Sequence, residues 1–195
     1  MRSESGRAVR PDVTVNLAAV NARLLRLARQ QSEDMKSQLI KAGVRIIQGE
    51  GRLDGPQRLV VSTGKGKKGT DFDEIDADTL VVSVGARPRM LDSAMPDGER
   101  ILTWTQVYDL DIVPERLVVV GSGVTGAEFA SAYNAFGSEV VLVSSRDHVL
   151  PGEDADAAYV LEEVFSRRGL RVLSRSRAAS VERTGDGVRV TLIDG

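Results

Sequence analysis

Hydrophobic residues recur every three or four positions near the start of the chain, a spacing that predicts one long amphipathic helix. The apolar stripe consists of Leu17, Val20, Leu24, Leu27 and Ala28. Asn16 is the expected N-cap, because its side-chain oxygen can accept hydrogen bonds from the first free backbone amides. Gly43 is expected to close the helix after residue 42. We expect the stripe to be buried.

Short runs rich in β-branched residues follow this helix. They predict strands at residues 44–48, 59–63 and 79–84. The stretch 64–74 mixes glycines with charges of both signs, which predicts an exposed hairpin loop. Residues 86–115 contain three prolines and are expected to connect two domains, with one short helix around Val107.

The second half of the chain alternates strands and helices, a pattern typical of a parallel sheet. The predicted elements are a buried strand at 117–120, a helix at 127–136 ended by Gly137, a strand at 139–143, a helix at 154–168 capped by Gly169, and strands at 170–173, 179–183 and 188–193 with a turn at 185–187. A strand, a helix and a second strand at this spacing form a βαβ unit. The predicted fold class is therefore α/β and Rossmann-like, in two partial domains that each carry a small β-rich segment.

The composition is that of an ordinary globular protein and excludes several classes of function. The 195 residues are 42% hydrophobic and 28% charged, and the formal net charge of −2 argues against a nucleic-acid partner or a basic membrane patch. The absence of cysteine excludes a disulfide framework, a thiolate zinc site and a dithiol redox centre within these residues. No apolar run approaches the roughly 20 residues that span a bilayer, and the N-terminus lacks the apolar core of a secretory signal. We expect a cytoplasmic location, no metal and no membrane.

A glycine-rich turn, GSGVTG, joins the strand at 117–120 to the following helix. Its candidate cofactor-binding residues are Gly121, Ser122, Gly123, Val124, Thr125 and Gly126. Gly121 permits a tight turn off the strand, Gly123 leaves room for a pyrophosphate beside the backbone, and Gly126 lets the helix pack on the strand. The free amides at the helix start then face the phosphates. An apolar strand, this turn, a helix and a second strand together predict a dinucleotide site, whereas the turn alone is weak evidence.

The end of the second strand is expected to contact the adenosine ribose. Ser144, Ser145 and Arg146 stand there, with no carboxylate to bind the 2′-hydroxyl of NAD. A charge-assisted bond from Arg146 to a 2′-phosphate is worth about 1.5–3 kcal/mol, so we expect NADP to be accepted at least as well as NAD. Alternatively, Arg146 is a solvated loop residue that Asp147 partly neutralises.

Several segments, in this order, resemble the pyridine nucleotide-disulfide oxidoreductases, the flavoproteins that include lipoamide dehydrogenase and glutathione reductase. They are Gly49 to Gly51, DTLVVSVGARP at 78–88, PERLVVVGSGVTGAEFA at 114–130, and SRDHVLPGEDAD. Within the family, GSGVTGAEF, WTQVYDL and LVSSRDHVLP are most similar to the NAD(P)H quinone reductase branch. The resemblance implies an FAD-dependent NAD(P)H oxidoreductase that passes hydride to the flavin and on to a small-molecule acceptor, a quinone or a disulfide.

The resemblance also assigns individual residues. Gly51 resembles a small residue that contacts the FAD adenine through its backbone. Val84, Gly85 and Ala86 occupy the second flavin-contact turn, usually written ATG, so Ser83 and Val84 stand where Ala and Thr are usual. Glu128 matches the acid of the GxGxxGxE pattern; alternatively, it is a structural partner on this helix. None of these is a catalytic residue, and the only histidine, His148, does not match the family's general acid.

Other family segments find no counterpart in the chain: the first FAD fingerprint, the redox-cysteine segment, the second flavin-phosphate segment and the dimerisation domain. We therefore expect a central piece of a homodimeric enzyme, with residues 1–113 forming part of the FAD domain and residues 114–195 an NAD(P) domain without its last strand. The alternative is a truncated, catalytically inactive nucleotide-binding module. A methyltransferase would leave the flavin-type segments unexplained.

Overall fold

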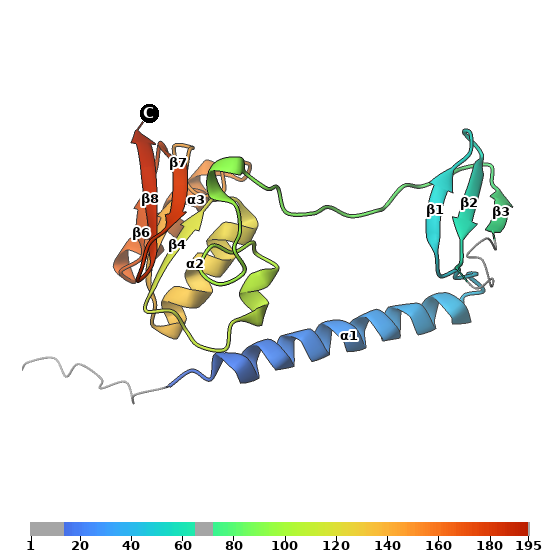
Figure 1. Ribbon diagram of the computed structural model, residues 1–195, viewed down its shortest axis with the longest axis horizontal. Coiled ribbons are helices and arrows are strands. Elements are labelled where there is room, and N and C mark those ends of the chain that lie inside the picture. The colour runs from blue at the N-terminus through green and yellow to red at the C-terminus, as the bar shows by residue number, and fades with distance from the viewer. Residues whose placement is uncertain (1–13, 65–71, 195) are drawn as a thin grey trace, which may run out of the picture. The chain divides into compact units, whose positions relative to one another are not determined.

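The computed structural model describes residues 14–64 and 72–194, which divide into two compact units (Figure 1). The first unit comprises residues 26–87. The second comprises the chain before residue 26 together with everything from Pro88 onward. The domain boundary expected at residue 113 stays a prediction.

Helix α1, Leu17–Lys41, confirms the predicted long helix and both of its ends. The Asn16 Oδ1 atom accepts a hydrogen bond from the Ala19 amide at 3.0 Å, as an N-cap does. At the other end Gly43 adopts φ +82°, the left-handed conformation that ends many helices. Asn21 is buried and donates from Nδ2 to the Leu110 carbonyl at 2.8 Å, which ties the first turns of α1 to its own unit.

The expected burial of the apolar stripe is wrong for most of its length. Leu17 is buried, but Leu24 is 46% exposed and Leu27 48% exposed. Every helical residue from 22 to 41 is exposed. Among the described residues no element covers this face. The amphipathic pattern therefore predicts the helix correctly, but it does not predict what packs against its apolar side.

The unit formed by residues 26–87 contains a three-stranded antiparallel sheet. Its strands are β1 Glu50–Leu53, β2 Arg58–Ser62 and β3 Phe72–Asp76, with β2 in the centre. The strand predicted at 59–63 is confirmed as β2. The strand predicted at 44–48 is wrong, because β1 and β3 occupy both edges of β2 and the pairing with β1 begins only at Glu50.

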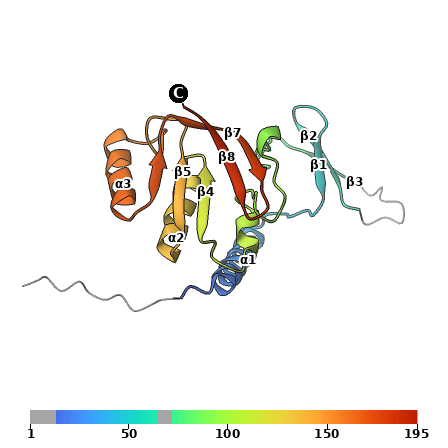
Figure 2. The same cartoon turned by 60° about the vertical axis from the view of Figure 1, so that its left-hand side comes forward.

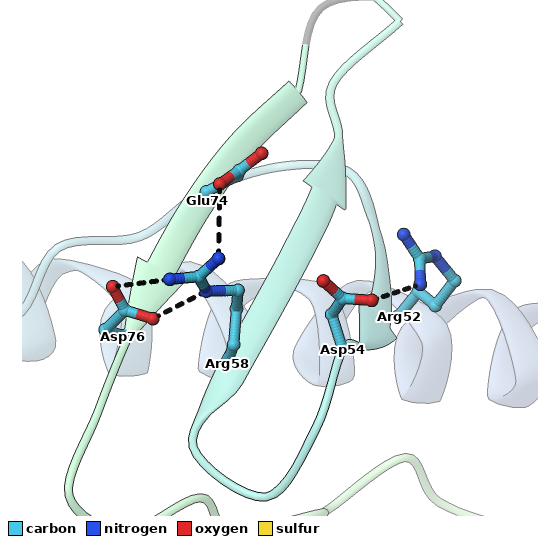
Figure 3. A network of polar contacts seen from close by, with 5 residues as sticks. All are labelled: Arg52, Asp54, Arg58, Glu74 and Asp76. Atoms are coloured by element: carbon cyan, nitrogen blue, oxygen red, sulfur yellow. Dashed lines mark hydrogen bonds and ion pairs between the residues drawn. The ribbon is translucent and has the colours of Figure 1, made fainter.

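Strand β3 corrects the expectation of a loop over residues 64–74; residues 65–71 of that loop lie outside the described part. Aspartate and glutamate disfavour strands, but their partners here are cationic. Arg58 on β2 donates from Nε to Asp76 at 2.8 Å and lies 3.9 Å from a Glu74 oxygen (Figure 3). The guanidinium of Arg58 lowers the pKa of the Asp76 carboxyl, chiefly through their hydrogen bond.

The strand predicted at 79–84 is also absent. These residues have no regular secondary structure and pair with no neighbour in the described chain, and Val81 and Val84 are 86% and 89% exposed. A strand exists only when a neighbouring backbone pairs with it, which composition alone does not reveal.

The larger unit is built on a parallel sheet in the order β4-β5-β6, as the βαβ pattern predicts (Figure 2). Its elements are β4 Arg116–Val120, α2 Val124–Phe136, β5 Glu139–Val143, α3 Ala155–Arg167 and β6 Arg171–Leu173. The core comprises Leu17, Ala127, Ala130, Tyr133, Val140, Leu142, Val149, Phe165 and Leu170. Burial alternates along β4: Leu117 and Val119 pack against this core, whereas Val118 and Val120 point to the opposite face and are exposed, so the expected complete burial of this strand is wrong.

A β-hairpin of β7 Ser176–Arg183 and β8 Val188–Asp194 follows, and its turn contains the predicted GDG. β7 begins three residues before the predicted start at 179. Two short 3-10 helices, η1 Asp92–Ala94 and η2 Gln106–Asp109, lie in the connection, and η2 confirms the helix expected around Val107.

Asp97 stabilises the connection in its charged form. Its Oδ1 atom accepts hydrogen bonds from the amides of Glu99, Arg100 and Ile101 at 2.8–2.9 Å, and Oδ2 lies 3.3 Å from Arg183 of β7. These donors hold the pKa of Asp97 far below its ordinary value, the Ile101 and Glu99 amides contributing most.

Because the folded-state pKa is depressed, this stabilisation is complete above the unfolded-state pKa of about 4 and disappears as the pH falls below it. Asp97→Asn should therefore lower the thermal midpoint at neutral pH, and its difference from the unmodified chain should shrink below about pH 4. Thermal unfolding of both proteins over the acid range measures this. Asp186→Asn, at an exposed acid in the β7–β8 turn, is the control; an equal effect of both substitutions would contradict the assignment.

Candidate dinucleotide site

The glycine turn between β4 and α2 has the geometry that its sequence predicts. Gly121 adopts φ +109°, which an L side chain rarely permits, and its amide donates to the Val143 carbonyl at 2.9 Å. Gly123 is the N-cap of α2, and a Cβ added to it would meet no atom within 4 Å. The backbone at the start of α2 is therefore open to a ligand.

Gly126 has the opposite surroundings. A Cβ added there would overlap the carbonyl oxygen of Gly121 and lie 3.5 Å from Val119 Cγ1. The absence of a side chain at this position lets the first turn of α2 pack directly on the end of β4. The two glycines thus differ in role: Gly126 serves packing and Gly123 leaves open space.

Ser144 at the end of β5 is part of the framework. It is fully buried, and its Oγ lies 2.7 Å from Ser122 Oγ and accepts from the Arg146 amide at 3.1 Å. The buried hydroxyl pair joins the glycine turn to the β5 loop. The Ser144 Oγ is thus hydrogen-bonded within the protein. Of the three predicted ribose residues, only Ser145 and Arg146 are exposed.

Two neighbouring cavities lie over this region, with volumes of about 300 and 600 Å³. The smaller is lined by residues that include Val120, Gly121, Ser122, Gly123, Ser145, Arg146 and Arg177, and the larger by residues that include Ser145, Arg146, Asp147 and His148. The cavities share Ser145, Arg146 and Pro151. The structure therefore brings the glycine turn and the exposed part of the predicted ribose site to one surface.

The charges around these cavities are predominantly positive. Asp147 forms an ion pair with Arg175 at 3.3 Å and not with Arg146. In the described part of the chain, neither Arg146 nor Arg177 has an acidic partner. The arrangement suits a ligand that carries several negative charges. Sequence reasoning missed Arg177, because it lies 31 positions after Arg146 and only the β6–β7 turn brings it to the same cavity.

The remaining residues of this predicted site lie on α2. Val124 is its first residue and 53% exposed, and Thr125 and Glu128 are also exposed.

His148 has its Nδ1 atom 2.7 Å from the Val149 carbonyl and its ring 5.4 Å from that of Tyr159. In the described chain no three His, Cys, Asp or Glu residues gather as metal ligands would.

The residues expected to contact FAD belong to the other unit. Gly51 lies in β1, opposite Val61 of β2. Gly85 adopts φ +72° between Val84 and Ala86, which are both exposed. None of them lines the two cavities described above.

Residues 5–195 match the protein family described as pyridine nucleotide-disulphide oxidoreductase. The chain belongs to this family. This confirms the resemblance found in the sequence and, together with the structural comparison below, the Rossmann-like α/β fold class. Members of the family are FAD-dependent and use NAD(P)H.

The chain is also similar to individual proteins. It is 52% identical over 188 residues to the NAD(P)H dehydrogenase (quinone) of Mycobacterium tuberculosis and 33% identical over 173 residues to the dihydrolipoyl dehydrogenase of Zymomonas mobilis. These matches include 94% and 89% of the chain but only 38% and 36% of the relatives, so the chain spans less than two-fifths of their length.

Solved structures show the same relation. LpdA from Mycobacterium tuberculosis aligns with a TM-score of 0.80 at 50% identity, over 94% of this chain and 40% of that one. A water-forming NADH oxidase from Lactobacillus brevis, bound to NADH, aligns with a TM-score of 0.57 at 22% identity, over 73% and 33% of the two chains, and shows the fold alone.

Among the described residues, no helix is both long and apolar enough to cross a bilayer.

Proposed function

We propose that this chain supplies the NAD(P)H-binding site of an FAD-dependent oxidoreductase that reduces a quinone. The observation that carries the proposal is the open backbone at Gly123 beside a cavity lined by Arg146, in a member of this family. The 52% identical relative is named as a quinone dehydrogenase, whereas the named dihydrolipoyl dehydrogenase is 33% identical. A quinone is therefore favoured over a disulfide as the acceptor.

The residues present fit a dinucleotide. The free amides at the start of α2, from Gly123 to Thr125, would hold the diphosphate at the positive end of the helix dipole. Ser145 and Arg146 would hold the adenosine ribose and any 2′-phosphate. Val124, exposed on the first turn of α2, and Glu128 would lie toward the nicotinamide half, as the family pattern implies.

The flavin half of the proposal rests on Gly51 and on the turn formed by Val84, Gly85 and Ala86. When bound, FAD supplies the isoalloxazine ring that accepts hydride and passes electrons on. The exposed apolar side chains of α1 and of residues 81–84 support the view that these segments pack against other parts of a longer protein. The homodimer, the cytoplasmic location and the domain boundary at residue 113 stay predictions for that protein.

The alternative is that this chain by itself is a nucleotide-binding module without activity. The exposed surroundings of Val84 favour it for the isolated chain, because the residues expected to contact flavin form no enclosed site among those described.

The visible spectrum of the purified chain, followed by NADPH oxidation with added FAD and a benzoquinone, tests both ideas. Bound flavin and quinone-dependent turnover would support an active oxidoreductase. A colourless protein that binds NADPH without turnover would support the module, and a folded protein that binds neither nucleotide would refute both.

A further inference from the structure

Arg177, at the start of β7, lines the same cavity as the glycine turn and Arg146. We propose that Arg177 is a second residue that selects NADPH over NADH, acting with Arg146 on the 2′-phosphate. This inference rests on the proposed function, since it assigns a specificity-determining residue to the same site.

The backbone holds Arg177 near the end of β5. The Ser176 amide donates to the Ser144 carbonyl at 2.8 Å, and the Arg175 amide donates to the Arg146 carbonyl at 2.9 Å. These bonds fasten the β6–β7 turn to the loop that carries Arg146. Ser176 is itself buried, which anchors the backbone of the neighbouring Arg177. The side chain of Arg177 is exposed.

Arg175, in the same turn, is the ion-pair partner of Asp147. It adopts φ +53°, a conformation that non-glycine residues seldom take, and its Nε lies 3.3 Å from Asp147 Oδ1. Asp147 is the only carboxylate among the residues that line the two cavities in the described structure. Because Arg175 neutralises it, the positive charges of Arg146 and Arg177 are left for a ligand.

NADPH differs from NADH by a phosphate on the ribose 2′-oxygen, and arginine binds phosphate with charge-assisted, often bidentate hydrogen bonds. A diphosphate held by backbone amides does not require two arginines. Two arginines without acidic partners therefore supply more positive charge than the diphosphate needs. They match a ligand with an additional phosphate near the adenosine ribose, which the family fold places at the end of β5.

Calorimetric titration of the chain with NADPH, NADH and adenosine 2′,5′-bisphosphate tests this assignment. Arg177→Met should weaken NADPH and the bisphosphate by about tenfold or more and leave NADH almost unchanged. Arg177→Lys should retain part of the preference, because it keeps the charge but not the bidentate geometry. Arg189→Met, at an exposed arginine on β8 that lines neither cavity, is the matched control.

Three results would overturn the inference. If Arg177→Met leaves NADPH affinity unchanged, or weakens NADPH and NADH equally, Arg177 does not select the 2′-phosphate, although the proposed dinucleotide site survives. If the unmodified chain binds neither nucleotide, the proposed function fails and the inference fails with it.

Discussion

Gly126→Ala is expected to lower the free energy of unfolding by about 3 kcal/mol, the upper end of the usual cost of overpacking. The added Cβ would overlap the Gly121 carbonyl oxygen, which belongs to the backbone and cannot rotate away. Relief requires α2 to move from the end of β4, and this loosens the contacts of Ala127 and Ala130 in the core. Urea unfolding followed by circular dichroism measures the loss.

Gly185→Ala is the matched control for this change. Gly185 lies in the β7–β8 turn, a Cβ there would meet no atom within 4 Å, and its φ is not positive. Its stability should stay within about 0.5 kcal/mol of that of the unmodified chain. Equal stability of the two variants would show that α2 and β4 do not pack as closely as described.

Gly123→Ala should leave the fold intact and weaken nucleotide binding, whereas Gly126→Ala acts on the stability of the fold. Gly123 has φ −67°, which alanine adopts without strain, and the added methyl group would enter open space. That space is where a diphosphate must approach the amides of α2. We expect NADPH and NADH to bind at least about tenfold more weakly, since hydrogen bonds to charged groups are each worth about 1.5–3 kcal/mol.

Fluorescence titration with both nucleotides measures this loss, and the unfolding curve of Gly123→Ala confirms that the fold is retained. Unchanged affinity for both nucleotides in the folded variant would mean that the phosphates do not approach this amide. Gly185→Ala again serves as the control, because it adds the same methyl group away from the site.

Much of the larger unit could be predicted because its signals are local. The glycines at 121, 123 and 126 carry separate conformational and packing demands, and the structure meets each of them. The N-cap of α1 is similarly local: Asn16 accepts a hydrogen bond from the amide three residues on. Periodicity then distinguishes helices from strands, as in the βαβ unit.

The errors concern contacts between distant residues. The run at 79–84 has the composition of a strand but no described partner, whereas acidic β3 pairs with β2, whose Arg58 forms an ion pair with Asp76. The stripe on α1 predicts a helix but not what covers it. Arg177 was missed for a related reason, since only backbone bonds between two turns place it beside the glycine turn.

Backbone amide NMR spectra of the chain during titration with NADPH test most directly whether the start of α2 binds a dinucleotide. This binding mode predicts that the largest shifts fall on Gly121 to Gly126, followed by Ser145, Arg146 and Arg177, with little change in the turn at 185–187. Shifts confined to other segments, or no shift at millimolar NADPH with a well-dispersed spectrum, would contradict it.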